Sequence, residues 1–357
     1  MTALYGIKYH RARKSKELFI PSGISPTQNE THAMQSRIQR LVTPIILVFS
    51  VVACSGVQTT DSANQNSRVS IVVIHHTTAN FGDSLHILTQ PSRYPVSSHY
   101  LIPEPGDQTY GKSALKTYQL VDESRRAWHA GTSYWAGKSG LNDQSIGIEL
   151  VNRARCHASE RGVNPSTGGP DRLCFYPDFA DGQIALLTEL LDDILERHPD
   201  VRPTHIIGHS DIAPDRKTDP GPRFPWQRLA ALGYGAWYDD ETVIYYWERF
   251  REQPLPLINK QKALAAYGYK IEPTGENDEQ TRNVVRAFQH HFRPWEVTRE
   301  MSRETTATLF ALLDKYYPEQ LDELLQVAEP LEPEAPIDIE QADDVLGPPV
   351  AETETTQ

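Results

Sequence analysis

Two short apolar segments that end in histidine constrain the fold of this chain more than any other feature. Residues 70–74 read SIVVI and run into His75 and His76, and residues 205–208 read HIIG and lead to His209. Brief apolar runs of this kind are typical of buried strands. A buried strand with a titratable residue at its end predicts a sheet that delivers side chains to a cleft.

The remaining periodicity predicts more strands and a helix around such a sheet. Strands are expected at 98–102, 118–121 and 145–151. A helix is expected over 183–197, with Asp181 as its N-cap and Pro199 beyond its end, because its apolar residues recur at helical spacing. We therefore predict a mixed α/β domain over residues 68–238, with a central β-sheet flanked by helices.

The strand-end histidines are candidate metal ligands. Asp219 follows His209 by ten residues, in the turn sequence TDPG, so its carboxylate can return to the same cleft. A catalytic zinc ion takes three protein ligands and keeps one position open. Adjacent strand residues point to opposite faces, so only one of His75 and His76 is expected to bind. His205 and His209 have a spacing that binds zinc on a helix, but the residues between them do not look helical.

A second unit is predicted over residues 257–317 as three short helices. Asn277 and Ser302 are candidate N-caps of the second and third helix. The preceding segment 239–256 contains Pro254 and Pro256 and is predicted to be a linker. The final segment 326–357 holds nine acidic residues, no basic residue and five prolines, so we expect a disordered tail.

The start of the chain carries the pattern of a lipoprotein signal peptide. Residues 41–53 have no charge, follow Arg37 and Arg40, and end at Cys54 in a sequence that resembles a lipobox. We interpret 34–53 as the signal peptide, Cys54 as the lipidated residue and 54–67 as a tether. Residues 1–33 are interpreted as a mis-called start and as disordered. The alternative is a buried strand that happens to end in cysteine.

The other two cysteines, Cys156 and Cys174, fit a disulfide in an oxidising compartment, with two free thiols as the alternative. The net charge of −12 and the lack of an obvious basic face argue against nucleic acid as a partner.

Five motifs then occur in one order along the first domain. They are VIHHTT (73–78), SSHYLI (97–102), RAWHAG (126–131), LNDQSIGIEL (141–150) and HSDIAPDRKTDPGPRFPW (209–226). Together they resemble the type 2 N-acetylmuramoyl-L-alanine amidases, whose zinc amidase fold is shared with peptidoglycan recognition proteins. The resemblance covers about residues 68–238 and implies hydrolysis of the amide between N-acetylmuramic acid, including its 1,6-anhydro form, and L-alanine.

The resemblance also implies roles for individual residues. His75, His209 and Asp219 would hold one zinc ion, although His76 stands where the family commonly has an aromatic residue. Glu149 would be the general base, and it points away from the apolar face of Ile146, Ile148 and Leu150. Lys217 would stabilise the oxyanion, and Trp128, His129 and Asn142 would line the substrate groove. The alternatives are a solvated strand residue for Glu149, a plain surface lysine for Lys217 and a core tryptophan for Trp128.

The helical unit at 257–317 resembles the three-helix peptidoglycan-binding domain, with a generic three-helix domain as the alternative. Deleting this unit would then weaken wall binding and spare small muropeptides. The expected partners are peptidoglycan and muropeptides, with a membrane contact through the lipid only, and the chain is expected to be monomeric. Because Ser55 is not aspartate, the expected location is the periplasmic side of the outer membrane. A non-catalytic peptidoglycan receptor and a zinc peptidase that cuts within the stem peptide are the alternative functions.

Overall fold

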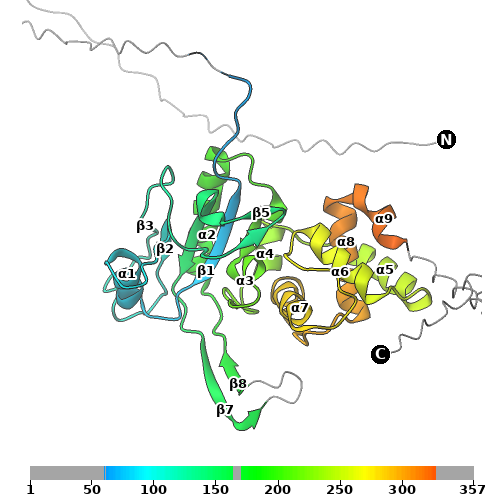
Figure 1. Cartoon of the computed structure of the whole chain (residues 1–357). Coiled ribbons are helices and arrows are strands. Elements are labelled where there is room, and N and C mark those ends of the chain that lie inside the picture. The colour runs from blue at the N-terminus through cyan, green and yellow to red at the C-terminus, as the bar shows by residue number, and fades with distance from the viewer. Residues whose placement is uncertain (1–59, 61, 164–169, 327–357) are drawn as a thin grey trace, which may run out of the picture. The chain divides into compact units, whose positions relative to one another are not determined.

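The computed structural model describes residues 60, 62–163 and 170–326, and gives only the backbone at 158–163 and 170–172 (Figure 1). The predicted signal peptide, the lipidation site Cys54 and the acidic tail lie outside these residues. The described residues from Ala63 onward belong to one compact unit.

A five-stranded sheet forms the centre of the first domain, as predicted. Its order is β3-β2-β6-β1-β9, with β3 antiparallel to β2 and the other pairs parallel. The strands are β1 (Ile71–His76), β2 (Tyr100–Ile102), β3 (Tyr118–Gln119), β6 (Ser145–Leu150) and β9 (Ile206–Gly208).

The register of the parallel strands gathers polar side chains at one edge of the sheet. His75 lies opposite Glu149 in the pairing of β1 with β6, and β9 ends immediately before His209. Ligand sites of open α/β sheets lie at the carboxyl ends of parallel strands. The sheet topology therefore brings the strand-end residues of the sequence to a common place.

Helices and short hairpins cover this sheet. Helix α2 (Asp181–Arg197) packs its apolar side on the sheet core, and its N-cap is Ala180 rather than the predicted Asp181. Helix α1 (Phe81–Thr89) was not predicted, and it starts where Asn80 Oδ1 accepts the Asp83 N–H at 2.8 Å. The other elements are β4 (Tyr134–Trp135), β5 (Lys138–Ser139), α3 (His209–Ile212), α4 (Trp226–Ala231) and three-residue 3-10 turns at 141–143 and 203–205.

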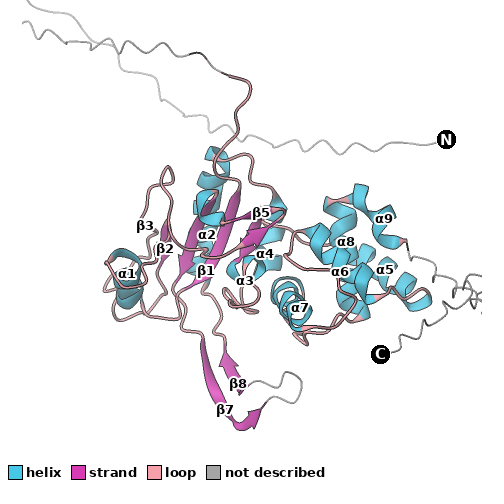
Figure 2. Cartoon of the chain, in the orientation of Figure 1, coloured by secondary structure: helices cyan, strands magenta, loops and turns pink. Residues whose placement is uncertain are grey.

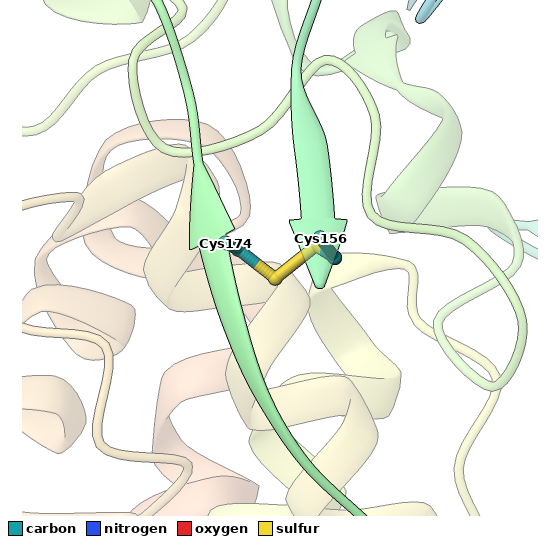
Figure 3. Close-up of a disulfide and its surroundings, with 2 residues drawn as sticks. All are labelled: Cys156 and Cys174. Atoms are coloured by element: carbon teal, nitrogen blue, oxygen red, sulfur yellow. A yellow bond between two sulfur atoms is a disulfide. The ribbon is translucent and has the colours of Figure 1, made fainter. Parts of the chain in front are cut away.

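A two-stranded hairpin projects away from the central sheet. It consists of β7 (Arg155–Val163) and β8 (Pro170–Phe175), which pair only with each other. Cys156 and Cys174 face each other across the hairpin, with Cα atoms 4.0 Å apart, and form a disulfide (Figure 3). The structure thus contains the cysteine pair that the sequence suggested, on a hairpin that the sequence did not reveal.

The C-terminal part is helical throughout the described residues (Figure 2). Helices α6 (Leu257–Tyr267), α7 (Glu279–Phe292) and α8 (Arg303–Tyr316) correspond to the three predicted helices. Ser302 caps α8 as predicted, whereas the cap of α7 is Asp278 and not Asn277. A 3-10 turn at 318–320 and α9 (Leu321–Leu325) complete this part.

The predicted linker at 239–256 is wrong. Residues Asp240–Glu252 form helix α5, which packs along α8. Tyr246 and Phe250 are buried there, with ring centroids 5.7 and 5.0 Å from that of Phe310. The apolar positions 243, 246, 247 and 250 of α5 have helical spacing, a signal that Pro254 and Pro256 obscured.

The sheet domain and the helical part share one hydrophobic core. Trp135 of β4 is buried, and its ring centroid lies 4.9 Å from that of Tyr269, which follows α6. The glycine that ends α6, Gly268, has φ of +138°, and a Cβ there would lie 2.9 Å from the Trp135 ring. This close approach requires glycine, and it fixes the helical part against the β4–β5 hairpin.

Candidate active site

Three side chains converge at the edge where β1 and β9 end. The Nδ1 atoms of His75 and His209 lie 3.0 Å apart, and Asp219 Oδ2 lies 3.2 and 3.1 Å from them. His75 is the fifth residue of β1, His209 is the first residue of α3, and Asp219 lies in the following loop. In the part of the chain that the structure describes, this is the group able to hold a metal ion.

The two segments that carry these residues are joined directly. The backbone N–H of Ser210 donates to the carbonyl of Asp219 at 2.8 Å. A Cβ on Gly208 would lie 2.7 Å from Cδ of Pro220, so the residues that flank the two ligands are in contact. The group is therefore held by backbone packing as well as by its side chains.

The spacing and charges of the group fit a divalent ion. Tetrahedral ligands at about 2.0–2.1 Å from zinc lie about 3.3 Å apart, close to the observed separations. Burial and the neighbouring His209 lower the pKa of His75 to about 4, so its imidazole is neutral at pH 7. Burial alone would raise the pKa of Asp219, but His209 and His75 outweigh burial and hold it well below its usual range.

His75, and not His76, belongs to this group. His76 also lines the cavity, but neither of its ring nitrogens has a hydrogen-bond partner within the described residues. Burial lowers its pKa. The group that could hold a metal ion therefore contains the histidine that the family resemblance implied.

Glu149 and Lys217 lie at the same cavity of about 370 Å³ as the three converging residues. Burial, together with the charge of Asp219, raises the pKa of Glu149 to about 8, and the charge of Lys217 opposes this rise. Glu149 Oε2 is buried and has no partner among the described residues. A carboxyl group in this position is available to exchange a proton with a molecule in the cavity.

Comparison with known proteins decides the family. Residues 65–222 match the sequence profile of N-acetylmuramoyl-L-alanine amidase, and residues 257–309 match that of a peptidoglycan binding domain. The N-acetylmuramoyl-L-alanine amidase AmiD of Escherichia coli (strain K12) is 42% identical over 250 residues, which are 70% of this chain and 84% of AmiD. The chain belongs to the N-acetylmuramoyl-L-alanine amidase family. Its activity is that of an N-acetylmuramoyl-L-alanine amidase, as the sequence predicted.

Solved structures of the family agree with this amidase over most of its length. AmpDh3 from Pseudomonas aeruginosa, in complex with an anhydromuramic pentapeptide, has a TM-score of 0.65 and 39% identity, covering 75% of this chain and 99% of AmpDh3. AmiD from E. coli, in complex with anhydro-N-acetylmuramic acid-L-Ala-D-gamma-Glu-L-Lys, has a TM-score of 0.59 and 39% identity, covering 72% and 93%. The predicted zinc amidase fold is confirmed.

Of the three predicted groove residues of this amidase, Trp128 is the most exposed to solvent. Its side chain is 48% exposed and lines the cavity. His129 also lines the cavity but is largely buried, with Nδ1 3.0 Å from Nε2 of His75. Asn142 Oδ1 accepts the backbone N–H groups of His129 and Ala130, so it supports the backbone and does not line the cavity. Trp128 and His129 therefore lie at the cavity, whereas Asn142 is not among the residues that line it.

His129 belongs to a chain of hydrogen bonds that has one consistent direction. The Ser145 hydroxyl donates to the Leu141 carbonyl at 2.6 Å, so Ser145 Oγ accepts from Nε2 of His129 at 3.2 Å. Burial and His75 hold the pKa of His129 well below its usual range, so its Nδ1 is free to accept from Nε2–H of His75. His75 then presents the lone pair of Nδ1 toward His209 and Asp219.

A parallel contact orients the second histidine of the amidase. His209 Nε2 lies 3.4 Å from the carbonyl oxygen of Ala130. The same carbonyl accepts from the guanidinium of Arg216, which also donates to Thr132. Sequence reasoning missed Ser145, Ala130 and Arg216 in these supporting roles, because their contacts depend on the tertiary fold.

Proposed function

We propose that this amidase uses one zinc ion, held by His75, His209 and Asp219, to hydrolyse the bond between the lactyl group of N-acetylmuramic acid and L-alanine. The observation that carries the proposal is the convergence of these three ligand atoms in one cavity with Glu149 and Lys217. When bound, a zinc ion polarises a carbonyl and lowers the pKa of a water molecule to about 7.

The residues of the chain supply the remaining chemistry. Glu149 lines the cavity, accepts the proton of the attacking water and passes it to the leaving amine, and its buried Oε2 has no partner among the described residues that would compete for this proton. Lys217 lies in the same cavity and stabilises negative charge that develops on the carbonyl oxygen. Trp128 offers a partly exposed aromatic surface beside the cavity, on which a sugar ring packs.

We propose muropeptides, including those with a 1,6-anhydro sugar, as substrates. The relatives named 1,6-anhydro-N-acetylmuramyl-L-alanine amidase AmpD, such as that of E. coli (39% identical over 137 residues, 58% of AmpD), support the anhydro form. The AmpDh3 and AmiD complexes named above also contain anhydromuramic peptides.

We further propose that the protein is a monomeric outer-membrane lipoprotein that faces the periplasm, anchored through Cys54 alone. The sequence pattern of residues 34–54 supports this location. In the part of the chain that the structure describes, no helix has both the length and the apolar character needed to cross a membrane. A disulfide at Cys156–Cys174 agrees with an oxidising compartment.

Mass spectrometry of purified muropeptides tests the activity directly. The chain from residue 57 onward is incubated with substrate, with and without a chelator. Release of the free stem peptide and a peptide-free sugar, lost with chelator and restored by zinc, is the expected result. Intact muropeptide that remains bound would identify a non-catalytic receptor, and fragments cut within the peptide would identify a peptidase.

A further inference from the structure

Asp211 lies two residues after His209, in the short helix α3, and is fully buried at 1% exposure. Its Oδ2 accepts the backbone N–H of Gly208 at 2.8 Å and lies 2.9 Å from Nδ1 of His291. Its Oδ1 accepts the hydroxyl of Tyr269 at 2.6 Å. Two of the three partners of this carboxylate therefore belong to the C-terminal helical part, and the third is the last residue of β9.

The two partners from the helical part are themselves fixed. His291 lies near the end of α7, and its ring stacks on that of Trp226 with centroids 3.9 Å apart. Tyr269 is buried against Trp135 of the β4–β5 hairpin. Arg286 of α7 adds a third link, because its guanidinium donates to the carbonyl of Pro214 at 2.6 Å. Helix α7 packs against α3 over this region (Figure 1).

Helix α3 depends on such external support. It has four residues, and an isolated helix of this length is not stable in water. A buried carboxylate also needs its hydrogen bonds, since removing one partner leaves the full cost of desolvation uncompensated. The position of α3 fixes His209, and through the Ser210 N–H contact it fixes the backbone of Asp219.

We propose that the helical part of this amidase positions the metal site, with Tyr269 and His291 acting as positioning residues through Asp211. The inference rests on the proposed role of His209 and Asp219 as metal ligands. It changes the expectation that this part is separable: deleting residues 257–317 would damage the metal site and would not leave the hydrolysis of small muropeptides intact. The resemblance of the helical part to a peptidoglycan-binding domain does not predict this contact, because Asp211 lies in the amidase domain.

Point variants of the chain from residue 57 onward test the proposal without removing a domain. Tyr269→Phe and His291→Phe keep an aromatic ring in place and remove the hydrogen bond to Asp211. Tyr267→Phe is the matched control, because Tyr267 is equally buried in the helical part and its hydroxyl makes no hydrogen bond within the described residues. Zinc affinity is measured by competition with a chromophoric chelator, and the ligand geometry by the visible spectrum of the Co²⁺-loaded protein.

We expect the double variant Tyr269→Phe/His291→Phe to bind zinc more weakly, by no more than the about 10–100-fold that removing a direct partner of a metal ligand costs, because both residues act through Asp211. Its Co²⁺ spectrum should shift, while binding to insoluble peptidoglycan stays unchanged and Tyr267→Phe behaves as the native protein. Urea unfolding of the zinc-free proteins shows whether the substitutions lower the free energy of unfolding of the whole protein or weaken zinc binding alone. If the double variant does not fold, the same measurements are made on the single variants Tyr269→Phe and His291→Phe.

Native zinc affinity and an unaltered Co²⁺ spectrum in the folded variants would overturn the inference. Such a result would leave the proposed function intact as long as the native protein binds zinc and hydrolyses muropeptides. A native protein that fails to bind zinc would instead remove the proposed function, on which the inference rests.

Discussion

Nε2 of His75 lies 3.0 Å from Nδ1 of His129, and this contact decides which nitrogen of His75 faces the proposed zinc ion. The donor in this pair is His75, because His129 donates its own Nε2–H to Ser145 Oγ. A proton held on Nε2 leaves Nδ1 with its lone pair, and Nδ1 is the atom that faces His209 and Asp219. The contact with His129 therefore favours the Nε2–H tautomer of His75 before any metal binds.

Substituting His129 tests whether this contact fixes the tautomer of His75. We expect His129→Phe to weaken zinc binding about 10–100-fold, because His75 loses the acceptor that fixes its tautomer and ring orientation. Zinc affinity is measured by chelator competition. The matched control is His76→Phe, the same substitution at the neighbouring residue, whose ring nitrogens have no partner within the described residues. Equal zinc affinity in the two variants would show that the contact does not matter for metal binding.

Glu149 is predicted to transfer protons as a general base and not to bind the metal. Glu149→Gln keeps the size of the side chain and removes its ability to exchange a proton, so we expect kcat to fall about 10²–10⁴-fold while zinc remains bound at one ion per chain. Metal content and muropeptide turnover are measured on the same sample. His209→Ala is the comparison, and it should lose both zinc and activity. Turnover near the native level in Glu149→Gln would refute the assigned role.

Much of this site could be predicted from the ends of strands. SIVVI before His75 and HIIG before His209 indicated buried strands that end in polar residues, and parallel strands place such ends at one edge. The family resemblance implied the role of Glu149, alternation in β6 predicted that it points away from the apolar face, and the register places it opposite His75. These features are local or follow from simple sheet geometry, so a single sequence contains them.

What the sequence did not reveal depends on contacts between distant residues. His129 was expected to bind substrate, but the sequence did not reveal that its ring contacts His75, which lies 54 residues earlier in the chain. Asp211 was not singled out, although it joins two domains, since its partners Tyr269 and His291 lie 58 and 80 residues further along the chain. The hairpin of β7 and β8 was hidden by its glycines and prolines, and only its cysteines indicated that its ends meet.

The disulfide of this hairpin is predicted to stabilise the hairpin and not the catalytic centre. Cys156 and Cys174 are 18 residues apart and lie on strands that pair only with each other. Closing a loop of this length stabilises by about 3 kcal/mol in the chain-entropy model, and here that stabilisation acts locally. In Cys156→Ser/Cys174→Ser, amide hydrogen exchange should accelerate within β7 and β8. Exchange in β1 and turnover of small muropeptides should stay at native values, and a matching acceleration in β1 would contradict a local role.

Glu123 is predicted to make the stability of the amidase depend on acid pH. Burial would raise its pKa, but hydrogen bonds from Arg197, Tyr100 and His198 lower it to about 2, from 4.5 in the unfolded chain. Because the folded pKa is the lower one, the stabilisation is complete above about pH 4.5 and is lost as the pH falls through 2. The full shift corresponds to about 3 kcal/mol, which we discount to about 1–2 kcal/mol because Arg197 is half-exposed and screened by solvent.

Urea unfolding of zinc-free protein between pH 6 and pH 2.5 measures the effect, with Glu123→Gln as the reference. The difference in the free energy of unfolding between the native chain and Glu123→Gln should shrink as the pH falls, and a difference that does not depend on pH would rule out this linkage.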